Sequence, residues 1–125
     1  MTVKRFDPRG MKFNGMSQAV QAGNMVYVSG QVALKDGEVV GLGDAIIQAE
    51  QSFTNIETVL QSAGCTFDNV VKITCYLTHK DSYSGFARVK NRVFANNSPA
   101  STCVIVEDLL LPGLLMEIEV EAWVD

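Results

Sequence analysis

MEIEVEAWV, residues 116–124, alternates apolar side chains with charged or aromatic ones along its length. A period of two is typical of a β-strand that buries one face. On the buried face we expect the apolar residues Met116, Ile118, Val120 and Ala122. On the other face we expect Glu117, Glu119, Glu121 and Trp123. Three glutamates would then share one face of a single strand.

Two helices are expected upstream. Asp44 is a good N-cap for a segment that runs to Ala63 with apolar residues every three or four positions, and Gly64 follows where a helix ends. A second helix is expected to begin at Ser82 and to end near Asn96, before Pro99. Its inward side chains would be Tyr83, Phe86, Val89 and Val93, and its outer face would hold Arg88, Lys90 and Arg92.

Shorter signals indicate more strands. Val70–Thr78, between the helices, alternates as a half-buried strand does. We expect its buried face to carry Val71, Ile73, Cys75 and Leu77, and its other face Lys72, Thr74 and Tyr76. Met25–Leu34 is an extended, largely apolar run, and Asp36-Gly37 after it predicts a hairpin turn.

This order of elements predicts an α+β fold in one domain over residues 1–125, because the length and the 47% of apolar residues suit a single core. Two helices can cover only one face of a sheet, so the other face must meet solvent or another subunit. Tyr27, Tyr76 and Trp123 are expected on or near that second face. Aromatic side chains beside charges favour an interface or pocket there, with a solvated acidic face as the alternative.

The composition excludes several classes of function. A net charge of -4 disfavours a sequence-independent grip on nucleic acid. No apolar stretch approaches the roughly 20 residues that span a bilayer and no signal-peptide core is evident, so we expect a cytoplasmic protein. Cys65, Cys75 and Cys103 form no CxxC pair, which predicts reduced thiols and no metal site. The glycines form no phosphate loop, which gives no support for a nucleotide cofactor.

Few side chains remain as candidates for chemistry. Glu119 could position or deprotonate a water from a partly buried site, or could be a solvated surface carboxylate. Cys103 lies in an apolar stretch, where a cysteine is more often inert packing than a nucleophile. His79 is the only histidine, has no ligand partner at a suitable spacing, and is expected to be structural or on the surface. Ser29 and the run Ser101–Cys103 complete the candidates.

The chain resembles the RidA/YjgF family of reactive-intermediate deaminases from about Gly15 to Val124. Each matching string is short, but their order and spacing are specific. They are Ser17-Gln18-Ala19, Gly23 to Gln31 (GNMVYVSGQ), Ala63-Gly64, Val70 to Leu77 (VVKITCYL), Pro99-Ala100, and Glu117-Ile118-Glu119 with Ala122.

The resemblance implies a chorismate-mutase-like subunit with a mixed sheet, packed on one face by two helices. It also implies a homotrimer in which the sheets close into a β-barrel, with small-molecule pockets between subunits. Well-known members hydrolyse enamines and imines such as 2-aminoacrylate to 2-oxo acids and ammonia without a cofactor. In that reading Glu119 orients the water and is the catalytic residue, and the pocket is lined by Ser29, Gly30, Thr102 and Cys103.

Three positions depart from the family pattern. The arginine that grips the substrate carboxylate directly after Pro-Ala is Ser101 here, a tyrosine near the N-terminus is Met16, and a second-helix asparagine is Ala87. An arginine fork binds a carboxylate with two parallel hydrogen bonds, which a serine does not do. Replacement cations could come from Lys12, Lys72, Arg88, Lys90 or Arg92, and the sequence does not choose among them.

Two functions stay open. The first is a divergent, cofactor-independent hydrolytic deaminase of an enamine, imine or related metabolite, distinct from the standard 2-aminoacrylate enzyme. The second is a non-catalytic trimer that binds a small metabolite or a protein partner in the same pockets. Ribonuclease activity, ascribed to some relatives, is disfavoured by the net charge of -4.

Overall fold

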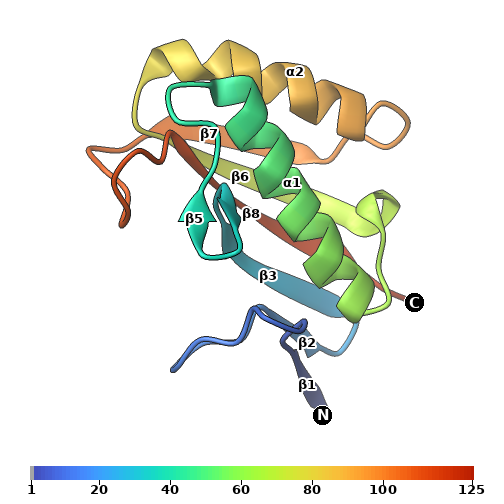
Figure 1. The fold of residues 1–125 in the computed structure, drawn as a ribbon. Helices are drawn as coiled ribbons and strands as arrows, with labels where there is room; N and C mark the ends of the chain where they lie inside the picture. The colour runs from blue at the N-terminus through green and yellow to red at the C-terminus, as the bar shows by residue number, and fades with distance from the viewer. Residues whose placement is uncertain (1) are drawn as a thin grey trace.

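The computed structural model describes residues 2–125, in which two α-helices and eight strands form an α+β fold (Figure 1). The elements are β1 (Val3–Phe6), β2 (Ala19–Ala22), β3 (Met25–Gln31), β4 (Leu34–Lys35), β5 (Glu38–Val39), α1 (Ala45–Ser62), the 3-10 turn η1 (Phe67–Asn69), β6 (Val70–Leu77), the 3-10 turn η2 (Lys80–Ser82), α2 (Tyr83–Val93), β7 (Ala100–Ile105) and β8 (Met116–Trp123).

The main sheet has six strands in the order β1-β2-β3-β8-β6-β7. Neighbouring strands are antiparallel except β6 and β7, which are parallel, so the sheet is mixed as expected. Both helices lie on the same side of this sheet (Figure 1). The core fills the space between them and includes Phe53, Ile56 and Phe86 from the helices and Ile73 and Ile118 from the strands.

The alternation in β8 is confirmed. Met116, Ile118, Val120 and Ala122 are buried against the helices. The glutamates between them point to the face of the sheet that the helices leave uncovered. The strand therefore separates core residues from polar residues along its whole length.

The first helix has the expected ends. Asp44 accepts a hydrogen bond from the Ile47 backbone N–H at 3.0 Å, and Gly64 follows the helix with a positive φ of 77°. The second helix begins after Ser82, also as expected, but Tyr83 does not point into the core. Tyr83 is 47% exposed and lies beside Phe86, because it occupies the first turn at the rim of the helix layer.

The buried face predicted for β6 is wrong at one residue. Val71 is exposed, and Val70 is buried in its place. The pairing with β8 shifts register between Val70 and Lys72, which is a β-bulge. A bulge inserts one residue into the alternation, so the residues before it face the opposite way from a regular pattern.

The Asp36-Gly37 turn is confirmed between β4 and β5. Both residues have positive φ angles, 52° and 81°, as a type I′ turn requires. Glycine takes this conformation without strain, and aspartate tolerates it better than most residues.

A buried amide joins the first helix to two loops. Gln48 is fully buried in α1, and its Nε2 donates to the carbonyl oxygens of Gly113 at 2.8 Å and Gly41 at 3.1 Å. Its Oε1 accepts from the backbone N–H of Leu115 at 2.8 Å. One side chain thus holds the segment that leads into β8.

Candidate functional site

The sheet has an open face, defined as the side that the helices do not cover. Its side chains are Tyr27 from β3, Lys72, Thr74 and Tyr76 from β6, Thr102 from β7, and Glu117, Glu119, Glu121 and Trp123 from β8. Tyr27 and Trp123 are about half exposed, as the sequence led us to expect for this face. The open face is therefore aromatic and acidic, with Lys72 as its one cation among these residues.

A hydrogen bond between tyrosine and glutamate lies near the middle of the open face. The Tyr76 hydroxyl donates to Oε1 of Glu119 at 2.6 Å across β6 and β8. Because the Glu119 carboxylate accepts a hydrogen bond from the protonated phenol, it raises the pKa of Tyr76. Burial and the charges of Glu119 and Glu117 raise this pKa further. This bond orients the Glu119 carboxylate and leaves Oε2 able to accept from a water or ligand.

Glu117 is the neighbouring carboxylate on the same strand. Its pKa is raised, first because burial disfavours the charged form and then because the charge of Glu119 repels a second negative charge. Two carboxyl groups of β8 therefore differ in their surroundings: the pKa of Glu117 is raised by burial, and Glu119 is held by the Tyr76 hydroxyl.

A second β-bulge places Ser29 and Gly30 opposite Glu119. The pairing of β3 with β8 is regular at Val28–Val120 and resumes at Gln31–Ile118, so two residues of β3 face one residue of β8. A Cβ atom on Gly30 would lie 2.7 Å from the Glu117 carboxylate, so any larger residue here would force the Glu117 side chain to shift. The Ser29 hydroxyl donates to the Ser17 carbonyl oxygen at 2.7 Å.

The residues that lie beside Glu119 across the open face come from β6 and β7. Thr74 pairs with Glu119 on one side and with Thr102 on the other. The Lys72 amine donates to the Thr102 hydroxyl at 2.5 Å. A small cavity of about 100 Å³ next to these residues is lined by Tyr27, Val28, Lys72, Thr74, Glu119, Val120 and Glu121. The structure thus brings together four predicted site residues: Glu119, Ser29, Gly30 and Thr102.

Ser101 and Cys103 lie on the other side of the sheet in the same chain. They pair with the buried residues Ile73 and Cys75 of β6 and face the helices, whereas Thr102 between them faces the open side. Ala87 is half-buried on α2. Met16 is partly exposed on the segment before β2, where it bridges to Phe13. Within one chain, the predicted site residues therefore lie on both faces of the sheet: Glu119 and Thr102 on the open face, and Ser101 and Cys103 on the side of the helices.

The two thiols on β6 and β7 are neighbours. Cys75 and Cys103 occupy paired positions of these strands, and burial is the main reason that the pKa of each thiol is raised. A thiol with a raised pKa is a poor nucleophile near neutral pH. This environment agrees with the packing role that we preferred for Cys103.

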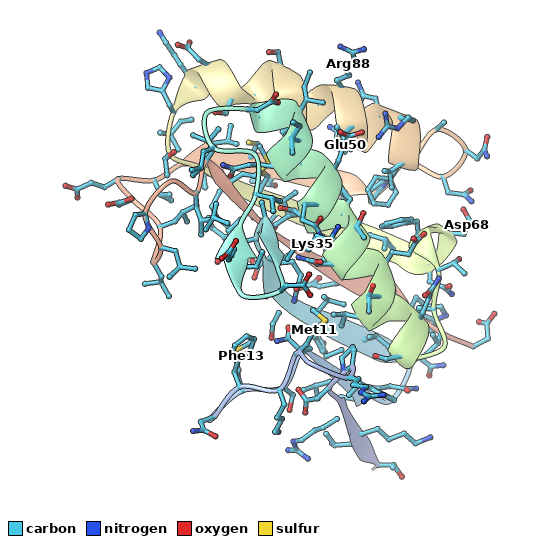
Figure 2. The ribbon with its side chains drawn as sticks, viewed as in Figure 1. Met11, Phe13, Lys35, Glu50, Asp68 and Arg88 are labelled. Carbon is cyan, nitrogen blue, oxygen red and sulfur yellow. The ribbon has the colours of Figure 1, made fainter. Side chains whose placement is uncertain are left out.

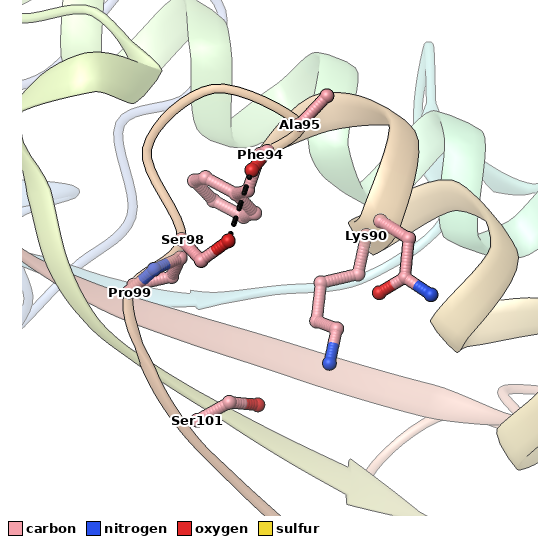
Figure 3. A pocket seen from close by; sticks show the side chains of 7 residues that line it. Lys90, Phe94, Ala95, Ser98, Pro99 and Ser101 are labelled. Carbon is pink, nitrogen blue, oxygen red and sulfur yellow. Dashed lines mark hydrogen bonds between the residues drawn. The ribbon is translucent and has the colours of Figure 1, made fainter.

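A larger cavity lies between α2 and β7, on the side of Ser101. It has a volume of about 210 Å³ and is lined by Lys90, Asn91, Phe94, Ala95, Ser98, Pro99 and Ser101. Figure 3 shows the Lys90 side chain reaching from α2 toward the strand that carries Ser101. Lys90 is half-buried, so its placement with Arg88 and Arg92 on the outer face of the helix was wrong.

The other two cations of α2 behave differently. Arg88 is exposed and points away from the sheet (Figure 2). Arg92 donates to the Glu50 carboxylate of α1 at 3.2 Å. Lys90 turns inward, and its amine lies over the Phe86 ring, 5.7 Å from the ring centroid.

The sole histidine takes a surface position. His79 accepts a hydrogen bond from the Asp81 backbone N–H at 3.1 Å and caps η2, with 61% of its side chain exposed. Among residues 2–125, no group of three or more His, Cys, Asp or Glu side chains gathers where it could hold a metal ion. None of the helices in this part of the chain has the length and apolar character to cross a membrane.

Comparison with known proteins places the chain among relatives of this architecture. Residues 11–124 match the family described as Endoribonuclease L-PSP. A goat (Capra hircus) protein named 2-iminobutanoate/2-iminopropanoate deaminase is 35% identical over 108 residues, which are 85% of this chain and 76% of the relative.

Yeast and mycobacterial proteins are similarly related. Mitochondrial protein MMF1 of Saccharomyces cerevisiae is 35% identical over 106 residues, 85% of this chain and 72% of that one, and the yeast Mmf1 crystal structure superposes with a TM-score of 0.89 over 98% of both chains. A Mycobacterium tuberculosis crystal structure described as a member of the YjgF/YER057c/UK114 family is 30% identical, with a TM-score of 0.85, and the match covers 98% of this chain and 100% of that one.

Proposed function

The chain belongs to the RidA/YjgF family, and from that membership we propose that it is a hydrolytic deaminase of an enamine or imine of a small metabolite. The observation that carries the proposal is the 2.6 Å hydrogen bond from Tyr76 to Glu119 on the open face. The name of the goat relative supports the reaction class.

Glu119 is proposed to hold and activate the attacking water. With Oε1 bound by Tyr76, Oε2 accepts a hydrogen bond from a water molecule and takes its proton as the oxygen attacks the imine carbon. Glu119 then returns this proton to the nitrogen, which gives a carbinolamine. It next takes the proton of the new hydroxyl group and delivers it to the amino nitrogen as the C–N bond breaks, so that ammonia and a carbonyl compound leave and Glu119 is again a carboxylate. The step consumes one water, leaves no net charge and needs no cofactor.

We further propose a homotrimer whose pockets lie between copies. Glu119 and Ser101 are on opposite faces of the sheet in one chain, so a pocket that contains both would take them from different copies. The exposed apolar side chains of Tyr27, Trp123, Val104 and Ile105 are suited to such contacts. We place the protein in the cytoplasm, although the yeast relative is named as mitochondrial.

The substrate is proposed to differ from 2-aminoacrylate. In the family pattern Ser101 stands where an arginine binds the substrate carboxylate, and a hydroxyl does not reproduce that contact. Met16 adds an apolar side chain near the N-terminus, which suits a larger or less polar ligand. A non-catalytic trimer that binds a metabolite in the same pockets is the alternative that the test must separate.

The test uses imines made in place from a panel of amino acids by an amino-acid oxidase, with ammonia release as the readout. Glu119→Gln keeps the shape of the side chain and should lower turnover about 100-fold or more, as expected for loss of a general base. Glu57→Gln, an exposed change on α1, is the matched control and should leave turnover unchanged.

Two outcomes would contradict the deaminase. One is a wild-type rate no higher than buffer for every imine. The other is full activity in Glu119→Gln. A metabolite that raises the melting temperature without being consumed would support the binding protein instead.

A further inference from the structure

We propose that two neighbouring loops form a docking surface for a basic amphipathic helix of a partner protein. This surface, the leucine patch, consists of four exposed aliphatic side chains: Leu42, Ile47, Leu110 and Leu111. Leu42 precedes α1 and Ile47 belongs to the first turn of that helix, whereas the other two lie in the loop between β7 and β8 (Figure 1).

Contacts at two glycines bring the parts of the leucine patch together. A Cβ atom on Gly113 would lie 2.5 Å from Cδ2 of Leu42, so this leucine lies against the loop between β7 and β8. A Cβ atom on Gly41 would lie 2.7 Å from Cγ2 of Ile47. The buried Gln48 amide donates to the carbonyl oxygens of both glycines and ties the two loops to each other. The patch is therefore one surface built from distant parts of the chain.

The loop between β7 and β8 holds its leucines in a defined turn. The Leu114 N–H donates to the Leu111 carbonyl oxygen at 3.4 Å, with Pro112 and Gly113 between them. Proline at the second position and a glycine with a φ of 86° at the third are typical of a type II turn. Leu114 is buried and anchors this turn to the domain. Docking on a preformed loop costs little conformational entropy.

The exposure of the leucine patch favours a protein contact. Leu110 is 96% exposed and Leu42 is 70% exposed. Single exposed leucines are common, but a contiguous apolar surface is typical of a site that another molecule covers. The patch shares no residue with the side chains proposed above for contacts between copies.

The charges beside the leucine patch favour a basic partner. Glu107 and Asp108 are exposed and precede Leu110 in the same loop. The two segments that build the patch, residues 36–71 and 93–125, contain no lysine or arginine. A second copy docked patch to patch would bring like charges together, which opposes association. Lysine or arginine side chains of a partner would instead meet carboxylates next to the apolar surface.

These two carboxylates are open to a partner. The ion pairs found within residues 2–125 include neither Glu107 nor Asp108. Asp108 uses Oδ1 to accept from the Leu109 N–H at 2.8 Å, and its Oδ2 can accept a further hydrogen bond. Asp44, next to Leu42 and Ile47, differs because it shares a surface hollow with Arg88 of α2.

The occupant follows from the two properties together. An amphipathic helix can lay its apolar face on the leucine patch, as such helices do in hydrophobic grooves. Lysines beside that face can bury their methylene stems on the leucines and extend their amines to Glu107 and Asp108. The inference goes beyond the proposed function, because this contact needs no deaminase activity.

The test is fluorescence anisotropy, with a labelled synthetic helix of leucines and lysines at helical spacing as the probe. At about 0.15 M salt, where distant charges are screened, we expect saturable binding to the wild-type protein. A peptide of the same pattern with glutamate in place of lysine should bind about ten-fold more weakly or worse, because its charges repel those of the loop.

One pair of variants tests the apolar contact. Leu110→Ser should weaken binding of the lysine peptide about ten-fold, as expected for a leucine that the partner would bury. Val71→Ser, the matched control, changes an exposed aliphatic residue of β6 and should leave the affinity within about two-fold. The side chain of Leu110 is almost fully exposed, so its removal should leave the melting temperature unchanged.

A second pair tests the charges. Glu107→Gln combined with Asp108→Asn should lower the affinity for the lysine peptide and make it depend less on salt. Glu57→Gln combined with Asp125→Asn removes two exposed charges elsewhere and should change neither property. Equal effects of the two double variants would mean that the peptide reads only the net charge, which overturns the proposal.

Three other results would also overturn it. The first is wild-type affinity in Leu110→Ser, or a loss in Val71→Ser as large as that in Leu110→Ser. The second comes from sedimentation velocity without peptide: if Leu110→Ser lowers the mass of the assembly, the leucine patch is a contact between copies. The third is co-sedimentation with phosphatidylcholine vesicles that Leu110→Ser abolishes, which would assign the patch to a lipid surface.

Discussion

Replacing Gln48 by leucine should destabilise the protein by about 3 kcal/mol. The change removes three hydrogen bonds that one buried side chain makes to the backbone. The Gly41 carbonyl oxygen keeps a partner, because it also accepts from the Asp44 N–H at 2.9 Å. The carbonyl of Gly113 and the N–H of Leu115 lose the partner that Gln48 provides.

The magnitude follows from these two backbone groups. Both groups bond to a fully buried side chain, so each one left without a partner costs about 1–3 kcal/mol, or roughly 2–6 kcal/mol together. The leucine recovers about 1–2 kcal/mol because it is apolar and position 48 is fully buried. A net loss near 3 kcal/mol is a large share of the roughly 5–15 kcal/mol by which proteins are stable.

The assay is urea unfolding followed by circular dichroism at one fixed protein concentration. With a slope of about 1.5 kcal/mol per M, the midpoint should fall by about 2 M. Gln61→Leu makes the same substitution at an exposed position of the same helix and should change stability by less than about 0.5 kcal/mol. Equal midpoints for the two variants would refute the reasoning that the Gln48 bonds hold the loop before β8.

Two further predictions concern ionisable groups. Because burial raises the pKa of Glu117, its contribution to stability is present below the ordinary glutamate value of about 4.3 and is lost as pH rises through the raised value. Glu117→Gln should remove this loss, and urea midpoints that fall with pH equally in both proteins would contradict it. The thiols of Cys65, Cys75 and Cys103 have raised pKa values, so a disulfide reagent near pH 7 should label them at least ten-fold more slowly in the folded protein than in urea. Rapid labelling of one thiol in the folded protein would count against the burial argument.

Local patterns predicted the parts of the fold that depend on neighbouring residues. The alternation of β8, the Asp44 cap of α1 and the Asp36-Gly37 turn each rest on a few adjacent positions, and all three are present in the structure. The bulge that exposes Val71 was not predictable, because VVKI remains apolar on both sides of the shift.

The site was predictable only in part, because its geometry depends on pairing between distant strands. Alternation placed Glu119 and Tyr76 on the uncovered side, but their hydrogen bond depends on the register of β8 against β6. β7 is an edge strand that shows no regular burial pattern, so the sequence did not show that Ser101 and Cys103 face the helices. Helical periodicity assigned Lys90 to solvent, whereas its amine lies over the Phe86 ring.

The alternation of β8 also bears on how this protein could change over generations. Its even-numbered residues form the core with the helices, and its odd-numbered residues carry the carboxylates of the open face. Mutations at the even-numbered positions act on stability. Mutations at the odd-numbered positions act mainly on what the surface binds or converts, with the pH-dependent effect of Glu117 on stability as an exception. Because the two sets share no position, selection can alter the chemistry of this strand while the fold that supports it is inherited unchanged.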